Sequence, residues 1–535
     1  MINTKEILTI SKEYKVITFD VFDTLIIRDV EKPADVFRHS YGFWGKYFRI
    51  LAEQSARKRR KNSEITLSEI GSYFHRKCNS EIEYEKRICR ANPKVFELYK
   101  ELKHMGKKIY AISDMYLDAN TVSEILISSG YELDGVFVSS EYACTKETGK
   151  LFSVFLETNN YNPEEILHIG DNNKSDYEGA CNAGIKAVLI PKHVDCLKYR
   201  RYSFKTDELD SFINHGLNEI DNPIERIGYE IVGPMVLCFC QWLHRQCKNN
   251  GFDRLYFLAR DMHFTFDIYN RLYNDDTHYL CVSRKSLRNA RNNPNDFIQY
   301  LNSEGCYGNI AVIDTGWVGT AQVEIEKYSK QIDPSTDLGG LYLGTNVAYR
   351  IRKRSKRSFA CVYSKFVEQL KCELASAFLE VLIGSQERQV VSYENGVPIF
   401  TDDSTDDSNN SVKMGAGKFI EDWSTIKDNK KISPESIKKP FERLFKNPYP
   451  EDIDALGDMR CDDVEISRII SYGGKEKYKR HINLWFHDLS LSPWKGGYFK
   501  KSFRYYRPLL EIYILINTIR NALIDIKHIK RDRLE

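Results

Sequence analysis

A series of short strand-like runs, each followed directly by a polar residue, constrains the fold more than any other feature of the sequence. The first run, VITFDVFDTLIIR (16–28), leads β-branched and aromatic residues straight into Asp20. Helical patterns separate the later runs, and the series lies at 15–20, 107–113, 135–139, 166–170 and 186–190. Strands that alternate with helices predict an α/β domain with a parallel sheet.

Polar side chains with complementary chemistry stand at the ends of four of these runs. They are Asp20, Asp23, Ser113, Lys146, Asp171 and Asp176. Because the carboxyl ends of parallel strands meet at one edge of a doubly wound sheet, we expect these side chains to converge on one crevice. A phosphoryl group needs a carboxylate to attack it, a cation to neutralise its oxygens, and acids to hold Mg²⁺. The series therefore predicts phosphoryl chemistry with Mg²⁺ as cofactor.

The same four motifs, in this order, resemble those of the haloacid dehalogenase-like (HAD) superfamily. DVFDT resembles its first motif, Ser113 its second, Lys146 in KETGKLF its third, and GDNNKSD its fourth. The resemblance covers residues 10–195, and a Lys-, Arg- and Glu-rich stretch with helical spacing, about 27–106, stands where that superfamily carries its cap. It implies a HAD-type phosphatase domain over residues 1–200, with a Rossmannoid parallel sheet and a helical cap.

The resemblance also implies a role for each metal ligand. Asp20 would be the nucleophile that forms an aspartyl-phosphate, and it would also bind Mg²⁺. The main-chain carbonyl of Phe22 would be a second ligand. Asp171 would complete the protein's share of the metal shell, and Asp176 would steer Asp171 or the metal-bound waters.

Two further positions would contact the phosphate. Ser113 would hydrogen-bond one of its oxygens, and Lys146 would pair with both the nucleophile and the phosphate. Lys150 is the alternative for the lysine, although the spacing to Phe152 favours Lys146. A solvated loop lysine is the simpler interpretation of Lys146.

The chain departs from the phosphatase pattern at the position of the general acid. Phosphatases of this superfamily place an acid two residues after the nucleophile, and here that residue is Phe22. Asp23 is the nearest substitute donor, with Asp118 and Glu85 as alternatives. Members that cleave carbon–halogen or carbon–phosphorus bonds also lack this acid, so dehalogenation stays open as an alternative.

A second alternation of strand and helix signals predicts another Rossmann-like α/β domain over 220–400. Its strand-like runs lie at 254–260, 278–284, 309–314 and 339–345. A polar, acidic stretch at 401–411 predicts a loop or a linker. The remainder, 412–535, has helical patterning and many aromatic residues, and we expect a helical C-terminal region.

Polar residues also follow the strand-like runs of this second domain. They are Arg260, Asp261, Ser283, Arg284, Asp314, Gly316, Gly319 and Thr320. A strand that ends in an acid and continues through a glycine-rich turn into a helix is suited to cradling phosphate. Two arginines at neighbouring strand ends could grip a pyrophosphate. The plainer alternative is a supporting domain whose glycines only allow tight turns.

The segment VIDTGWVGT (312–320) loosely resembles the phosphoribosyl pyrophosphate loop of phosphoribosyltransferases. It departs from that loop because Asp314 is its single acid and Trp317–Val318 interrupt the glycines. The whole chain resembles bacterial polysaccharide-biosynthesis HAD hydrolases, some of which join such a domain to a phosphatase to install ribofuranose.

That resemblance implies a two-step enzyme of O-antigen or capsule synthesis. It would transfer ribose 5-phosphate from phosphoribosyl pyrophosphate to a glycan and then remove the 5-phosphate. Mg²⁺ and Asp314 would hold the donor, and Arg260, Arg284 and the turn at 316–320 would stabilise the departing pyrophosphate. Two alternatives stay open. The chain could be a single-activity phosphatase whose C-terminal half binds a glycan or a partner glycosyltransferase, or a non-catalytic assembly factor.

The composition limits which classes of partner and which cellular compartment we expect. A net charge of +3 on 535 residues does not indicate a nucleic-acid partner. Thirteen scattered cysteines without a C-x-x-C pair, and an N-terminus without an apolar core, predict a reduced cytoplasmic protein. The stretch 507–533 predicts an amphipathic helix that either docks on the protein or lies peripherally on an anionic inner membrane.

Overall fold

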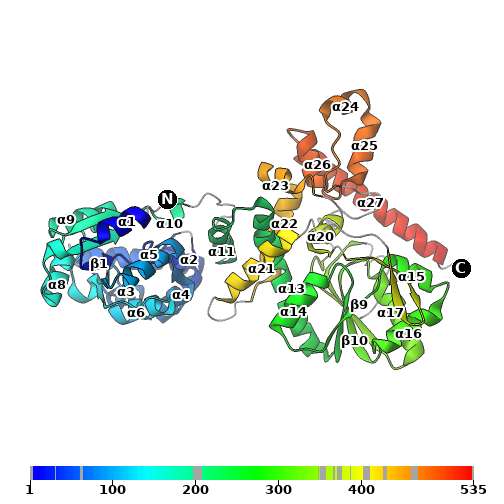
Figure 1. Cartoon of the computed structure of the whole chain (residues 1–535), viewed down its shortest axis with the longest axis horizontal. Coiled ribbons are helices and arrows are strands. Elements are labelled where there is room, and N and C mark those ends of the chain that lie inside the picture. The colour runs from blue at the N-terminus through cyan, green and yellow to red at the C-terminus, as the bar shows by residue number, and fades with distance from the viewer. Residues whose placement is uncertain are drawn as a thin grey trace. The chain divides into compact units, whose positions relative to one another are not determined.

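The chain forms two compact units, Met1–Asn218 and Glu219–Glu535 (Figure 1). The computed structural model describes residues 4–30, 32–60, 64–196, 208–347, 349, 357–365, 368–369, 376–385, 387–401, 410–425, 431–459 and 468–532. Each unit is built around its own parallel sheet, so the α/β class predicted from the sequence is confirmed.

The first unit contains a five-stranded parallel sheet in the order β5-β4-β1-β6-β7. Its strands are β1 (Val16–Phe19), β4 (Lys108–Ser113), β5 (Gly135–Val138), β6 (Ile166–Gly170) and β7 (Lys186–Leu189). All five lie where the strand-like runs were predicted. Side chains alternate between two apolar layers, with Ile17 and Phe19 on one face and Val16 on the other. Both faces of the sheet are therefore covered, as parallel sheets require.

Helices pack around this sheet. They are α1 (Thr4–Ser11), α5 (Pro93–His104), α6 (Ala119–Ser128), α7 (Ser139–Tyr142), α8 (Lys150–Asn159), η1 (Pro163–Glu165), η2 (Asn173–Glu178) and α9 (Gly179–Asn182). After β7, the chain continues into α10 (His193–Cys196) and α11 (Glu208–Leu217). The strand order reverses at β1, whose neighbours are β4 and β6. In this topology the crevice at the carboxyl ends of β1 and β6 is the place where ligands bind.

A helical insertion separates β1 from β4 in the sequence. A short antiparallel strand pair, β2 (Ile26–Arg28) and β3 (Cys89–Ala91), frames α2 (Asp35–Arg60), α3 (Leu67–Phe74) and α4 (Asn79–Ile88). The fully buried Arg49 of α2 holds the insertion together through Glu81 of α4, with nitrogen–oxygen distances of 2.7 and 2.8 Å. The strand pair was not predicted, because three-residue strands leave too short a pattern to recognise.

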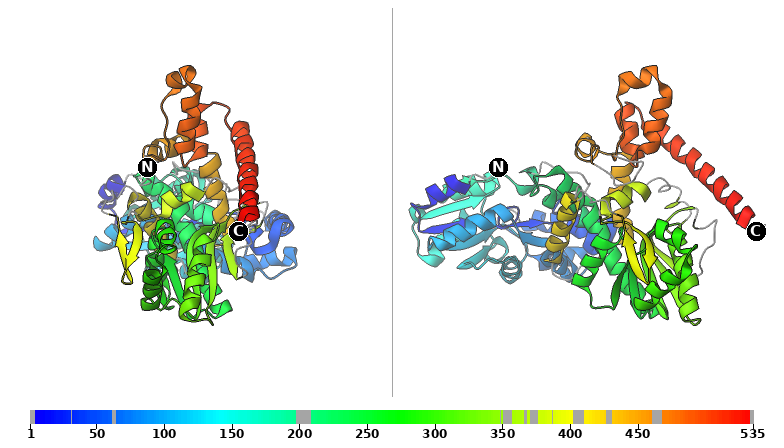
Figure 2. Two further views of the ribbon diagram at one scale, coloured as in Figure 1. Left: turned by 90° about the vertical axis from the view of Figure 1, so that its right-hand side faces the viewer. Right: turned by 45° about the vertical axis from the view of Figure 1, so that its right-hand side comes forward.

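The second unit contains another five-stranded parallel sheet, in the order β12-β11-β10-β8-β9. Figure 2 shows the green strands of this sheet from two further directions. Its strands are β8 (Arg254–Leu258), β9 (Thr277–Leu280), β10 (Asn309–Trp317), β11 (Asp337–Thr345) and β12 (Ser358–Val362). The first four were predicted and β12 was not. In this order the topological switch lies between β8 and β10, where their carboxyl ends form a crevice.

Helices and a hairpin complete the second unit. Around the sheet lie α12 (Pro223–Ile227), η3 (Gly228–Val232), α13 (Gly233–Asn250), α14 (His263–Leu272), α15 (Arg284–Ala290), α16 (Pro294–Ser303), α17 (Thr320–Ile332), α20 (Ser376–Ile383) and the hairpin β13 (Val390–Glu394) and β14 (Val397–Phe400). The C-terminal helices are α21 (Asn410–Ser424), α22 (Pro434–Lys446), α23 (Pro450–Leu456), α24 (Lys475–Arg480), α25 (Ile482–Leu491), α26 (Lys495–Ser502) and α27 (Arg507–Asp532).

The helical C-terminal region agrees with the prediction, whereas most of the linker predicted at 401–411 lies outside the described residues. Among the helices of the described ranges, none combines the length and the apolar character needed to cross a bilayer.

Candidate functional site

Three carboxylates meet at the switch point of the first sheet. Asp20 follows β1 directly, and its amide donates a hydrogen bond of 2.9 Å to the carbonyl of Ile169 in β6. Asp171 follows the end of β6, and Asp176 lies within η2. One oxygen from each of Asp20, Asp171 and Asp176 lies within 4.8 Å of the others. The four-motif pattern therefore brings its acids together.

Lys146 lies between two of these carboxylates. Its Nζ is 2.5 Å from Oδ1 of Asp20 and 2.5 Å from Oδ1 of Asp176, and its side chain is 1% exposed. Lys150, the alternative raised by the sequence, lies exposed at the start of α8. Of the two lysines, Lys146 is the one at the carboxylates.

The electrostatics of the cluster follow mainly from burial and from the buried ammonium group of Lys146. Burial raises the pKa of Asp20 well above its ordinary value, and Lys146 only partly opposes this. Burial and the neighbouring Asp176 likewise raise the pKa of Asp171. Burial would also raise the pKa of Asp176, but Lys146 and His168 outweigh it and lower that pKa. For Lys146, the attraction of Asp20 and Asp176 outweighs burial and raises its pKa.

The donor set fits a divalent cation. Three carboxylates share the buried ammonium group of Lys146, and the half-exposed Lys192 reaches Asp171 only at 3.5 Å, which leaves negative charge that burial makes unfavourable. Carboxylate oxygens are the ligands that Mg²⁺ prefers. Asp20 and Asp171, whose pKa values are raised, are the residues that a cation would stabilise most in their ionised form.

Several residues that the sequence did not indicate hold this cluster in place. Thr18 and His168 face each other in register on β1 and β6, with Oγ1 of Thr18 2.8 Å from Nδ1 of His168. Nε2 of His168 lies 3.5 Å from Oδ1 of Asp176. A hydroxyl and an imidazole within otherwise apolar buried strands are the signal that could have revealed this pair.

Asp171 and Lys146 have further supports. Oγ1 of Thr24 donates to Oδ1 of Asp171 at 3.2 Å, and Nζ of Lys192 lies 3.5 Å from the other oxygen. The backbone amide of Lys146 donates to both oxygens of Asp114, at 2.9 and 3.1 Å. The acid next to Ser113 therefore orients the lysine from its main chain.

Two glycines allow the close approach of these groups. A Cβ on Gly170 would lie 2.4 Å from Cγ of Asp176. A Cβ on Gly179, at the start of α9, would lie 2.1 Å from the carbonyl oxygen of Lys146. Real side chains do not tolerate such distances, so both positions require glycine while the site keeps this geometry.

The remaining predicted residues lie at the same edge of the sheet. Ser113 is buried at the end of β4. Asp23 is half-buried with a φ of 63°, and its charge helps to raise the pKa of Asp171 after burial and Asp176. The ring of Phe22 lies under the guanidinium of Arg28, 3.9 Å from its carbon to the ring centroid.

The two alternative proton donors have other partners. Oδ1 of Asp118 accepts from the amide of Thr121 at 2.7 Å and so caps α6. Glu85 is 1% exposed and lies 2.9 Å from Nε of Arg28. Among the described contacts, Asp23 neither caps a helix nor forms an ion pair within 4.0 Å, so of the three candidate acids it is the one left available for proton transfer.

A second carboxylate pair lies at the switch point of the second sheet. Oγ1 of Thr315 is 3.3 Å from Oδ2 of Asp261, which follows β8, and 3.4 Å from Oδ1 of Asp314 in β10. Burial and the charge of Asp261 raise the pKa of Asp314 to about 7. Burial raises the pKa of Asp261 as well, opposed by Arg284 and Arg260.

The other predicted residues of this unit divide into two groups. Arg260 and Arg284 lie near the carboxylate pair, and Arg284 is 88% exposed, 3.5 Å from Oε1 of Glu380. Ser283 instead caps α15 by accepting from the amide of Ser286 at 3.0 Å, and it donates to the carbonyl of Val390 at 2.6 Å. Ser283 is thus engaged in local structure.

The glycine-rich segment begins its turn later than predicted. β10 continues through Trp317, and Gly316 pairs with Gly344 of β11. A Cβ on Gly316 would lie 2.5 Å from the carbonyl oxygen of Gly344, so this glycine serves strand packing. Gly319, with a φ of 73°, precedes Thr320, the first residue of α17. Of the phosphate-binding turn expected from the sequence, the structure therefore provides the N-terminus of α17.

A triad that the sequence did not indicate lies beside this pair. Nε2 of His263 is 3.0 Å from Oε1 of Glu387, and the hydroxyl of Tyr279 donates to its other oxygen at 2.7 Å. Hydrogen bonding from His263 lowers the pKa of Glu387 to about 2. His263 follows Asp261 by two residues, and that proximity is the only signal in the sequence.

Solved structures similar to part of this chain include HAD hydrolases and dehalogenases. A HAD hydrolase from Bacillus subtilis bound to magnesium is 17% identical, with a TM-score of 0.27, over 33% of this chain and 89% of its own. A HAD phosphatase from Thermococcus onnurineus is 17% identical, with a TM-score of 0.27, over 36% and 90%. The L-2-haloacid dehalogenase from Xanthobacter autotrophicus is also 17% identical, with the same TM-score, over 33% and 77%. No protein-family model and no curated protein matches the sequence.

Proposed function

We propose that the first unit is a Mg²⁺-dependent phosphomonoesterase of the HAD type with Asp20 as its nucleophile. One observation carries this proposal: the carboxylates of Asp20, Asp171 and Asp176 converge within 4.8 Å at the switch point of a parallel sheet, with Lys146 buried against two of them. Asp20, Asp171 and the carbonyl of Phe22 would hold Mg²⁺, and Asp176 would orient them.

The chain's own residues account for the steps of hydrolysis. Lys146 and Ser113 bind the phosphate oxygens, and a carboxylate oxygen of Asp20 attacks phosphorus. The bond from phosphorus to the substrate oxygen breaks, and that oxygen takes a proton from Asp23. Asp23, now a carboxylate, accepts a proton from water, whose oxygen attacks the aspartyl-phosphate and releases phosphate and free Asp20. When bound, Mg²⁺ supplies electrophilic stabilisation of the phosphate oxygens.

Displacement of halide from carbon is the second candidate chemistry, because Phe22 occupies the position of the acid. A carboxylate nucleophile alone is sufficient for that reaction. Two more carboxylates within 4.8 Å would repel the carboxylate of a haloacid, whereas with a cation they suit a phosphate. The acidic cluster therefore favours phosphomonoester hydrolysis.

We further infer that the second unit transfers ribose 5-phosphate from phosphoribosyl pyrophosphate to a glycan hydroxyl. Support comes from the carboxylate pair Asp261 and Asp314 at the switch point, the nearby Arg260 and Arg284, and the start of α17. In this step the bond from the anomeric carbon to pyrophosphate breaks, and the pyrophosphate departs with the electron pair. The acceptor oxygen bonds to that carbon, and Asp314 takes its proton.

The two activities form a coherent sequence, since the product of transfer carries a 5-phosphate that the first unit would remove. The alternative is a single phosphatase whose second unit only binds a glycan or a partner protein. The engaged positions Ser283 and Gly316 fit that alternative, because they contribute to folding rather than to a phosphate cradle.

Mass spectrometry of acceptor oligosaccharides incubated with phosphoribosyl pyrophosphate and Mg²⁺ separates these functions. With Asp20→Asn we expect the acceptor to gain ribose plus phosphate, and with wild type ribose alone. Asp314→Asn should abolish both products while hydrolysis of a simple phosphomonoester continues. Asp118→Asn is the matched control, because Asp118 only caps a helix. If the protein hydrolyses a phosphomonoester but the acceptor gains no mass, the phosphatase proposal stands and the transferase proposal is refuted. If hydrolysis continues in Asp20→Asn, the phosphatase proposal is refuted.

A further inference from the structure

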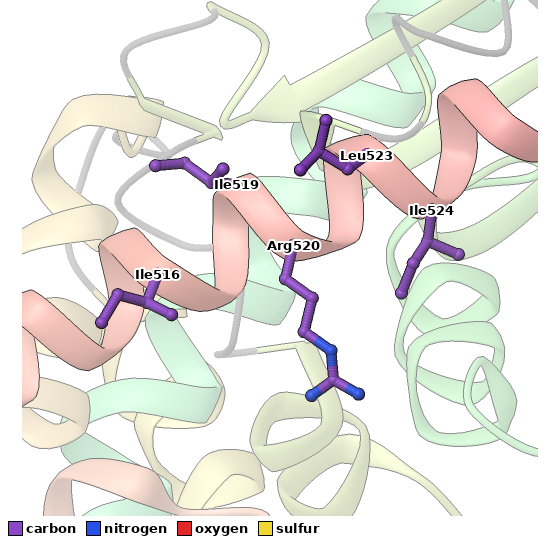
Figure 3. Close-up of a pocket in the computed structure, with 5 residues that line it drawn as sticks. All are labelled: Ile516, Ile519, Arg520, Leu523 and Ile524. Carbon is purple, nitrogen blue, oxygen red and sulfur yellow. The ribbon is translucent and has the colours of Figure 1, made fainter.

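The longest exposed apolar ridge in the described part of the chain follows one side of α27. Six aliphatic residues along it are spaced alternately by three and four positions and are 42% to 59% exposed: Leu509, Ile512, Ile516, Ile519, Leu523 and Ile526. Leu515, at 58%, lies beside them. Figure 3 shows several of these side chains extending from the helix together with Arg520. A contiguous exposed ridge of this kind marks an interaction site.

The ridge is not the face by which the helix joins its own unit. Leu510, Ile514 and Thr518 form a separate line and are 1% to 4% exposed. Tyr513 contacts the ring of Phe499 in α26, with centroids 5.3 Å apart, and Glu511 is ion-paired with Lys446 in α22. With 3.6 residues per turn, the buried line and the ridge fall on opposite sides of the helix. The protein thus holds one side of α27 and leaves the ridge open.

Charged positions divide between the same two sides. Arg520 is exposed next to the ridge (Figure 3). By the helical period, positions Lys527 and Lys530 fall on the ridge side, and positions Glu511 and Asp525 fall away from it. An apolar ridge with an exposed arginine beside it and basic sequence positions further along the same side complements an anionic surface.

We propose that α27 lies in the plane of an anionic lipid bilayer, with its ridge among the acyl chains and the basic positions at the headgroups. The hydrophobic contact and the electrostatic attraction act on the same side of the helix, as interfacial helices require. A second copy of the chain fits less well. Two such ridges packed as a coiled coil would bring the basic flanks of both helices together, where like charges repel.

Vesicle sedimentation with the full-length protein tests this proposal. We expect wild type to bind vesicles of phosphatidylglycerol and phosphatidylcholine at least about tenfold more tightly than vesicles of phosphatidylcholine alone. Ile519→Glu combined with Leu523→Glu should lower binding to the anionic vesicles by at least about tenfold, because it places carboxylates in the ridge. Circular dichroism should be unchanged, since both side chains are more than half exposed.

Asn517→Glu combined with Asn521→Glu is the matched control. It adds the same two charges to half-buried positions on the side away from the ridge, and with an unchanged circular dichroism spectrum we expect binding to change by less than about threefold. If both double variants lose vesicle binding equally, the loss comes from the added net charge and not from the ridge, and the proposal is overturned. A wild-type dimer that binds no vesicles and becomes monomeric in the ridge variant would assign the surface to a second copy instead.

Discussion

Replacing Lys146 with methionine removes the buried ammonium group of the carboxylate cluster while keeping a side chain of similar bulk. That group lies 2.5 Å from Oδ1 of Asp20 and 2.5 Å from Oδ1 of Asp176. Removing one partner of a buried ion pair costs about 3–5 kcal/mol, because the remaining charge stays desolvated. We expect the free energy of unfolding of the first unit to fall by about that amount at pH 7.

The loss should shrink as the pH falls. Burial already raises the pKa of Asp20, and without the ammonium group that pKa rises further. A carboxyl whose pKa is higher in the folded state than in the unfolded state destabilises the fold when it ionises. The loss of stability begins as the pH rises above the unfolded-state pKa of about 3.9 and grows until the pH reaches the folded-state pKa. Lowering the pH from 7 to 5 therefore restores part of the variant's stability. In wild type the pKa of Asp176 is lowered, because Lys146 and His168 outweigh its burial, so this group stays ionised throughout that range.

Hydrogen exchange of peptides that contain β1 and β6 measures this stability within the intact chain. Release of phosphate from a chromogenic phosphomonoester should fall by about 10²–10³ in the same variant, as expected when a charge-stabilising group is lost. Lys150→Met is the control, since Lys150 is exposed and should change stability by less than about 0.5 kcal/mol. If the two variants behave alike, or if Lys146→Met is least stable at pH 5, the electrostatic account of the site is wrong.

Three further outcomes follow from the geometry. Gly179→Ala places a Cβ 2.1 Å from the carbonyl oxygen of Lys146, and we expect phosphate release to fall at least about tenfold with an unchanged circular dichroism spectrum. Burial and Asp261 raise the pKa of Asp314 to about 7, so transfer that uses Asp314 as a base should increase from pH 6 to 8, and a rate that does not change over this range would contradict that role. Chelation with EDTA should stop phosphate release and lower the melting temperature of the first unit, because the carboxylates of Asp20 and Asp171 repel each other without a cation. Added Mg²⁺ should restore both the activity and the melting temperature.

The sequence predicted the strands of both sheets well because buried parallel strands are continuous apolar runs. It also predicted the polar residues that follow them, since a charged side chain directly after such a run is uncommon. Acids at strand ends meet when the strands are neighbours, as β1 and β6 are, and that adjacency turns the motif order into a site. The prediction therefore succeeded where local pattern and topology agree.

Elsewhere the deciding interactions are between residues far apart in the chain. Thr18 and His168 read as ordinary strand residues until the register of β1 and β6 brings them face to face. Glu387 lies more than 100 positions from His263, and only the fold joins them. Gly316 was predicted in a turn, but its pairing with β11 extends the strand through it. Pairing partners of this kind are not encoded in any short window of sequence.

The main chain around Lys146 is held from two sides, by Asp114 at its amide and by the close approach of Gly179 at its carbonyl. The loop therefore loses its conformational freedom when the unit folds, before any ligand arrives. Oxyanions that mimic a pentacoordinate phosphorus, such as vanadate, would then bind with little further ordering of the protein. Their affinity would reflect charge and shape almost alone, and tightening this loop further by mutation would gain little.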